Sequence, residues 1–111
     1  MEIHFKTPRL AKDCNDDKRL SKKHGADQAR KIRQRLDDLT AAVTLHEMRS
    51  LPGNCHELSG DRADQLAVNL KDGLRLVFVP ADDPIPRRED SGLDWKLITA
   101  ICVVEITDYH G

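Results

Sequence analysis

The chain has 111 residues and a mass of 12.6 kDa, with 39% hydrophobic residues, 33% charged residues and a formal net charge of −1. This length allows one domain with one core, and the apolar content excludes a disordered chain. No apolar run reaches the roughly 20 residues of a membrane helix, and residues 1–6 lack the apolar segment of a signal peptide, so we expect a cytoplasmic protein with no membrane partner.

The first half of the chain is expected to form a short strand followed by helices. Residues 2–6 alternate weakly between apolar and polar side chains and indicate a strand that ends before Pro8. Residues 15–17 supply capping side chains for a helix that ends near His24, and Gly25 suits its C-terminal end. In the next segment the apolar residues recur every three or four positions, which predicts one buried stripe made of Ala29, Ile32, Leu36, Leu39 and Val43. The basic residues between them are expected to face water: Arg30, Lys31, Arg33 and Arg35.

The second half of the chain is expected to be mostly strands. Residues 44–50 resemble a last helical turn, and residues 66–70 and 74–79 alternate around an Asp-Gly turn, which predicts a hairpin. Residues 80–94 hold three of the five prolines and are predicted to form an exposed excursion. Residues 95–110 are predicted to form one long strand with apolar side chains on both faces. Helices followed by strands favour a single α+β domain over 1–111, with the helices packed on one face of a mainly antiparallel sheet.

The near-neutral total hides an uneven distribution of charge. Residues 1–50 carry a net charge of +4, and residues 51–111 carry −5. Between positions 18 and 35, eight Lys and Arg residues accompany a single acid, Asp27. Such a basic helical segment is typical of an ordinary solvated helix face. It can also contact a nucleic-acid backbone, and the two interpretations are compatible. Arg30, Lys31 and Arg33 are its candidate contacts.

The cysteines and known motifs point to no cofactor. Cys14, Cys55 and Cys102 are odd in number and form no C-x-x-C pair, so we expect neither a disulfide framework nor a zinc knuckle. Cys55 is adjacent to His56, but no second pair of ligands stands at metal spacing. Phosphate-binding glycine motifs and H-E-x-x-H are also missing from the sequence.

A few polar residues stand where the predicted strands begin, run or end. His56 precedes the hairpin, Arg75 lies inside an otherwise apolar strand, and Tyr109 and His110 end the last strand. An arginine in such a strand requires a partner or a cleft. Asp108 or Glu105 could pair with Arg75 in a structural ion pair, and the spacing alone leaves this alternative open.

Three segments carry a resemblance to a known family. These are residues 56–62 (HELSGDR), 74–78 (LRLVF) and 104–110 (VEITDYH). Together with the Gly25 break and the basic helix 26–39, they resemble the HigB-type branch of the RelE/ParE toxin superfamily over nearly the whole chain. The resemblance implies a small RelE/ParE-like fold and a metal-independent endoribonuclease that cuts messenger RNA on the ribosome. It also implies a toxin–antitoxin hetero-oligomer with a HigA-like antitoxin.

The resemblance implies active-site residues at His56, Arg75, Tyr109 and His110. Histidine transfers protons near neutral pH, and arginine holds a phosphate through its planar fork. We expect the two histidines to share proton transfer, Arg75 to stabilise the pentacoordinate phosphate, and Tyr109 to stack on a base or to orient the reacting group. Which histidine is the base stays open. Ser59 stands where the family often has lysine, so Arg62 is the candidate replacement cation.

Two other functions fit the same fold. A ParE-like inhibitor of DNA gyrase needs no proton-transfer residues, and the histidines favour RNA cleavage over it. A chain that has lost activity and only binds an antitoxin would fit Ser59 and the acidic second half of the sequence.

Overall fold

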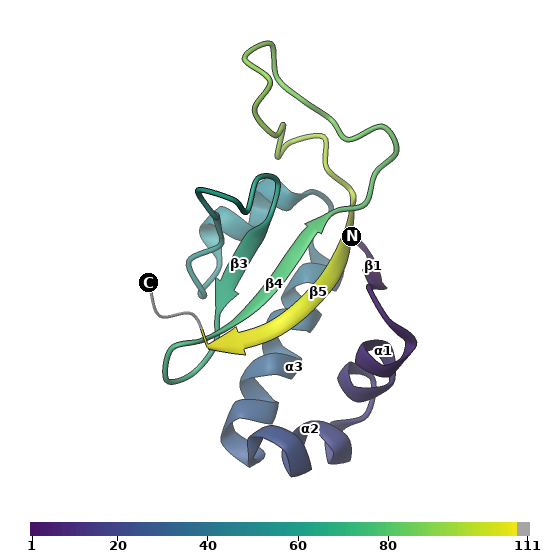
Figure 1. The fold of residues 1–111 in the computed structure, drawn as a ribbon, viewed down its shortest axis with the longest axis vertical. Helices are drawn as coiled ribbons and strands as arrows, with labels where there is room; N and C mark the ends of the chain where they lie inside the picture. The colour runs from purple at the N-terminus through teal and green to yellow at the C-terminus, as the bar shows by residue number, and fades with distance from the viewer. Residues whose placement is uncertain (109–111) are drawn as a thin grey trace.

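The computed structural model describes residues 1–108, which form a five-stranded sheet covered by helices on one side (Figure 1). The strands are β1 (Glu2–Phe5), β2 (His56–Glu57), β3 (Leu66–Asn69), β4 (Leu74–Pro80) and β5 (Ala100–Asp108), in the order β1-β5-β4-β3-β2. Only β1 and β5 pair in parallel within this part of the chain. The helices are α1 (Pro8–Cys14), α2 (Asp17–His24), α3 (Ala26–Ala41) and the 3₁₀ helix η1 (Leu45–Ser50). The predicted α+β class is confirmed.

Side-chain caps define the first two helices. The Thr7 hydroxyl accepts a hydrogen bond from the Leu10 amide at 3.1 Å, and Pro8 occupies the first turn of α1, where its missing N–H costs nothing. The sequence analysis did not predict this helix. The Asp16 carboxylate accepts from the first amides of α2, and Gly25, with φ +85°, separates α2 from α3. The α2 boundaries therefore agree with the prediction.

The structure departs from the prediction at Val43, just after α3, and at Arg35 within it. Val43 is 70% exposed, because the chain leaves the helix at Ala42 and the helical repeat no longer applies. Arg35, expected to face water, is only 6% exposed. At 3.6 residues per turn Arg35 lies about 40° around the helix from Leu39, so it borders the buried stripe. Its Nε donates to the carbonyl of Asn69 at 2.9 Å, which ties α3 to the end of β3.

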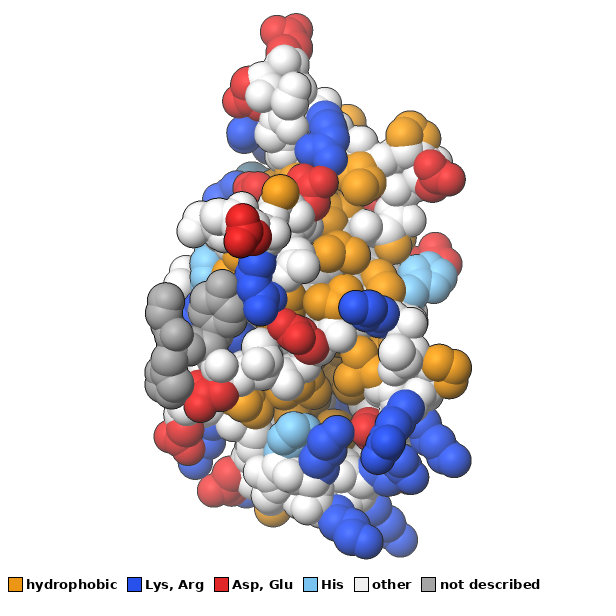
Figure 2. All heavy atoms as spheres, viewed as in Figure 1, with side chains coloured by type: hydrophobic (Ala, Val, Ile, Leu, Met, Phe, Trp, Pro, Cys, Tyr) orange, Lys and Arg blue, Asp and Glu red, His pale blue; other side chains and the backbone are white. Residues whose placement is uncertain are grey.

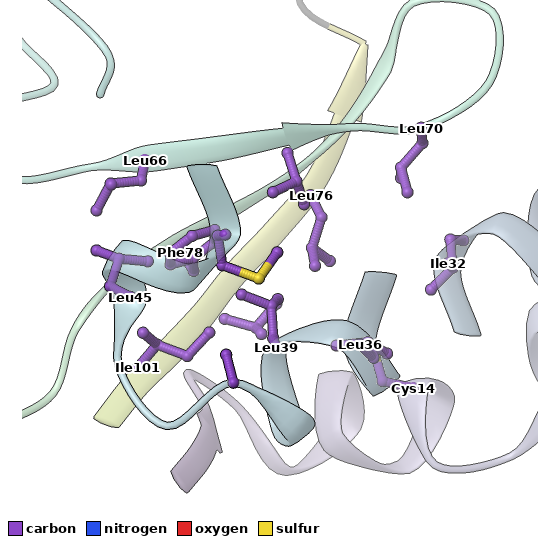
Figure 3. Packing of buried hydrophobic residues seen from close by; sticks show 14 of the residues in the cluster. Cys14, Ile32, Leu36, Leu39, Leu45, Leu66, Leu70, Leu76, Phe78 and Ile101 are labelled. Atoms are coloured by element: carbon purple, nitrogen blue, oxygen red, sulfur yellow. The ribbon is translucent and has the colours of Figure 1, made fainter. Parts of the chain in front are cut away.

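The core lies between α3 and the helix-facing side of the sheet. Leu36 and Leu39 of α3 pack toward Phe78 and Ile101 of the central strands, and α1 contributes Cys14 (Figure 3). Nearly all of these side chains are excluded from solvent. Burying an aliphatic or aromatic side chain of this size contributes about 1.5–3 kcal/mol, so this layer is the main source of stability.

The hairpin turn is fixed to the start of α3. The side-chain amide of Gln28 donates to the carbonyl of Lys71 at 2.8 Å and accepts from the Lys71 amide at 2.9 Å. The predicted turn at residues 71–73 is confirmed, and Asp72 and Gly73 both have positive φ. Because both polar groups of one turn residue are satisfied, the β3–β4 hairpin is held against the helical layer.

Residues 81–99 form a long loop that projects at the top of Figure 1, in place of the predicted strand over 95–99. Trp95 and Ile98 are buried, and their carbonyls accept from the amides of η1, so these residues pack as irregular structure against the helical layer. The carboxylate of Asp82 accepts hydrogen bonds from both Thr99 and the Ala100 amide, which closes the base of the loop. Within residues 1–108 no helix combines the length and the apolar character needed to cross a membrane.

Candidate active site on the open face of the sheet

One face of the sheet is covered by none of the helices within residues 1–108, and we call it the open face. It points toward the viewer in Figure 1, with α3 behind the strands. In β4, Leu76 and Phe78 belong to the core, so the alternate residues Arg75 and Val77 point to the open face. Residues opposite one another share a face, which adds a cross-strand row of four residues at the open face: His56, Ala67, Val77 and Glu105.

Strand register brings two of the predicted catalytic residues together. His56 lies opposite Ala67, Ala67 lies opposite Val77, and Arg75 is two residues further along the same strand as Val77. Standard strand spacings put the Cα atoms of His56 and Arg75 roughly 12 Å apart. Both side chains are half-buried. An arginine and a histidine on one face at this separation can reach a common phosphodiester from two sides.

A tight turn orients His56. Gly53 and Asn54 both have positive φ, and the Gly53 carbonyl accepts from the Asn69 amide at 2.7 Å. The ring Nδ1 of His56 is 2.7 Å from the Asn54 carbonyl oxygen. A carbonyl can only accept, so Nδ1 carries the proton in this contact. In the neutral ring Nε2 then has a lone pair that can take a proton, which suits a general base.

Arg62 extends the open face with a second cation. Its Nη1 donates to Glu105 at 2.9 Å and to Gln65 at 3.0 Å. This ion pair fastens the loop of residues 58–65 to β5. Ser59, which stands where the resembled family often has lysine, is exposed in the same loop. The Arg62 guanidinium therefore lies at the open face with its charge partly offset by Glu105.

Tyr109 and His110, the other two predicted catalytic residues, lie outside the described residues. Their predicted roles therefore remain predictions. Near its described end, β5 runs beside Arg75 of β4, because Thr107 lies opposite Arg75.

The three predicted RNA-binding residues of α3 have different surroundings. Arg30 is exposed and pairs with Asp27, and Lys31 contacts Gln34 at 3.4 Å. Arg33 is held inside the helical layer, where it donates to Asp17 and to the carbonyl of Cys14. It borders the buried stripe, about 40° around the helix from Ala29. Arg33 is thus a clamp between three helices, whereas Arg30 is exposed as expected and Lys31 is half-buried.

Glu57, which the sequence analysis gave no role, has a structural one. Its carboxylate accepts from the indole Nε1 of Trp95 at 3.1 Å, and the Arg49 guanidinium lies 4.0 Å from the centre of the same ring. Side chains alternate along β2, so Glu57 faces the helical layer while His56 faces the open side. The motif His-Glu therefore places one residue at the candidate site and uses the next to anchor the 81–99 loop. No local pattern in the sequence predicts this contact, because Glu57 and Trp95 are 38 positions apart.

The three cysteines are free thiols, and Cys14 and Cys55 are not activated. Burial raises the pKa of Cys55 to about 12 and that of Cys14 to about 11. Both are therefore neutral at physiological pH and poor nucleophiles. Residues 1–108 contain no group of three His, Cys, Asp or Glu side chains arranged to hold a metal ion.

Comparison with protein-family models, with curated proteins and with solved structures gave no match to this chain.

Proposed function

We propose that the chain is a toxin-type endoribonuclease that cleaves messenger RNA, as its resemblance to HigB-type toxins implies. The observation that carries the proposal is the register of the sheet. It puts an arginine and a histidine whose Nδ1 bonds to the Asn54 carbonyl on the same face of the sheet, opposite the helical layer and within reach of the same phosphodiester. RNA brings its own nucleophile, the ribose 2′-hydroxyl, so the protein has to supply a base, an acid and a cation.

The proposed reaction uses side chains for all three tasks. His56 Nε2 takes the proton of the 2′-hydroxyl while the 2′-oxygen attacks phosphorus. The guanidinium of Arg75 binds the oxygens of the pentacoordinate phosphate, where negative charge accumulates. The bond from phosphorus to the 5′-oxygen breaks, and His110 gives that oxygen a proton. The products are a 2′,3′-cyclic phosphate and a 5′-hydroxyl end.

Partners follow from the same proposal. A toxin of this kind acts on translating ribosomes in the cytoplasm and is held inactive by a HigA-like antitoxin in a hetero-oligomer. Arg62 is proposed to help bind the message at the open face, while Arg30 and Lys31 are proposed to contact ribosomal RNA. Tyr109 is proposed to stack on a base or to orient the scissile group.

The test is induction of the chain in a bacterium that lacks the antitoxin, followed by mapping of 5′-hydroxyl ends in translated messages. We expect growth arrest and new ends in the wild type. His56→Ala or Arg75→Ala should lower cleavage by about a hundredfold or more, because each removes a proton-transfer group or the phosphate cation. His46→Ala and Arg88→Ala remove the same side chains from exposed positions outside the open face and should leave cleavage unchanged.

The ion pair between Arg62 and Glu105 favours a second candidate function. An arginine already satisfied within the fold, beside Ser59 in place of lysine, fits a chain that only binds an antitoxin. That function predicts no growth arrest and no new RNA ends. Arrest without RNA breaks, together with loss of supercoiling by purified gyrase, would instead favour the gyrase inhibitor.

A further inference from the structure

A hollow of about 410 Å³ lies between α1 and α2, outside the open-face site. Four cations and one carboxylate line it: Arg9, Arg19, Lys22, Lys23 and Asp13. Figure 2 shows Lys and Arg side chains gathered over this end of the molecule. Counting the formal charges leaves an excess of three positive charges around one cavity.

Asp13 fixes half of these cations in position. It is buried at the end of α1, and its carboxylate receives Arg19 Nε at 2.9 Å and Lys23 Nζ at 3.5 Å. The hydrogen bond from Arg19 lowers the pKa of Asp13, so the carboxylate is ionised at neutral pH. Both cations still expose a large part of their side chains, 42% for Arg19 and 59% for Lys23. They can therefore donate into the hollow without leaving Asp13.

The other two cations have no counter-charge in the described part of the chain. Arg9 and Lys22 are exposed, and neither makes an ion pair with any of residues 1–108. Their like charges repel one another and the cations held by Asp13, and a bound anion would relieve that repulsion. The walls are also fixed, because Arg33 bonds to Asp17 of α2 and to the carbonyl of Cys14 in α1.

We propose that this hollow is a binding site for linked phosphate groups. Three excess charges exceed what one carboxylate would balance, and an arginine fork beside lysine ammonium groups matches the several oxygens of phosphates. The volume is within the usual range of small-molecule sites and holds more than one phosphate. Such groups occur in the backbone of RNA and in free polyphosphates.

A second hollow links this site to the sheet. It has a volume of about 250 Å³, shares Arg9, Asp13 and Lys23 with the first, and reaches Val104, Glu105 and Ile106 of β5. The charge of Glu105 on this path is offset by Arg62. An RNA strand bound in the α1–α2 hollow could therefore continue along β5. Only this choice of source rests on the proposed function, whereas the phosphate site itself does not.

The experiment measures binding without turnover. The probes are a fluorescein-labelled 12-nucleotide single strand with 2′-O-methyl groups, which cannot be cut by attack of the 2′-oxygen, and inorganic tripolyphosphate as competitor. Arg9→Glu/Lys22→Glu is compared with Arg88→Glu/Lys96→Glu, which makes the same charge change in a different hollow of about 360 Å³ near Trp95. Circular dichroism checks that both variants keep the fold.

We expect the Arg9/Lys22 variant to bind both probes at least tenfold more weakly than the wild type. Loss of two phosphate contacts should also reduce the slope of log K against log salt by about 1.4. The control variant should stay within about threefold of the wild type. If both probes are affected and compete, the RNA backbone is the source. If only tripolyphosphate binding is affected, the source is a free polyphosphate. Equal losses in the two variants, or no binding by the wild type, would overturn the proposal.

Discussion

Replacing Gly53 with alanine would test how the turn before His56 is held. Gly53 has φ +111°, and a Cβ added there would lie 2.7 Å from Nε of Arg35. Real Cβ contacts are longer, so one group has to move. Arg35 cannot retreat easily, because it is buried and its Nε donates to the Asn69 carbonyl at 2.9 Å. The overlap therefore falls on a residue that joins α3 to β3.

The expected cost has two parts. A side chain at this positive φ costs about 1–3 kcal/mol in backbone strain. Forcing the buried guanidinium aside adds about 1–3 kcal/mol, as overpacking does elsewhere. The sum of about 4 kcal/mol is a large fraction of the roughly 5–15 kcal/mol of stability that is typical of a domain.

Gly25→Ala is the matched control for the backbone part. Its φ is +85°, but no atom lies within 4 Å of the added Cβ. We expect Gly25→Ala to lower the free energy of unfolding in urea by about 1–2 kcal/mol and Gly53→Ala by clearly more. In an Arg35→Ala background the cost of Gly53→Ala should fall toward the Gly25→Ala value. Equal costs for the two glycines in the wild-type background would refute the reasoning.

Two further predictions concern the 81–99 loop. Glu57→Ala removes the hydrogen-bond acceptor of the buried Trp95 indole. We expect the free energy of unfolding in urea to fall by about 1–3 kcal/mol and the fluorescence emission of the single tryptophan to shift. An unchanged emission spectrum and an unchanged urea midpoint would contradict the anchoring role of Glu57. Burial raises the pKa of Asp82, but hydrogen bonds from Thr99 and Ala100 outweigh it and hold the pKa below the ordinary 3.8. The stability that ionised Asp82 contributes is therefore present above pH 3.8 and is lost as the pH falls through the lowered pKa. Asp82→Asn should make the free energy of unfolding fall less steeply below pH 4. The control Asp83→Asn, at an exposed position, should not change that dependence on pH.

The sequence predicted those elements whose signals are local. The cap at Asp16, the break at Gly25 and the Asp-Gly turn at 72–73 act within a few residues, and the structure has them where expected. Helix α1 is not predicted by the sequence pattern, because Pro8 is equally compatible with the end of a strand and with the first turn of a helix. With α1 unrecognised, the hollow that Arg9 shares with α2 could not be foreseen.

The candidate site depended on pairing between distant segments. His56 and Arg75 are 19 positions apart, and their shared face follows from the registers of β2 with β3 and of β3 with β4. A slip of one residue in either pairing would turn one side chain to the core. Arg35 could not be predicted as buried for a similar reason. Its partner, the carbonyl of Asn69, is 34 positions away and lies beside Arg35 only in the folded chain.

The two proposed reactive groups differ in how firmly the sheet holds them. Arg75 lies within a seven-residue strand that pairs on both sides, whereas His56 belongs to a two-residue strand that pairs with β3 alone among residues 1–108. Short edge segments open locally at a smaller free-energy cost than central strands. The imidazole can therefore adjust its position when a strand of nucleotides arrives, while the guanidinium acts as the fixed reference point. Amide hydrogen exchange should accordingly be much faster at residues 56–57 than at residues 75–78.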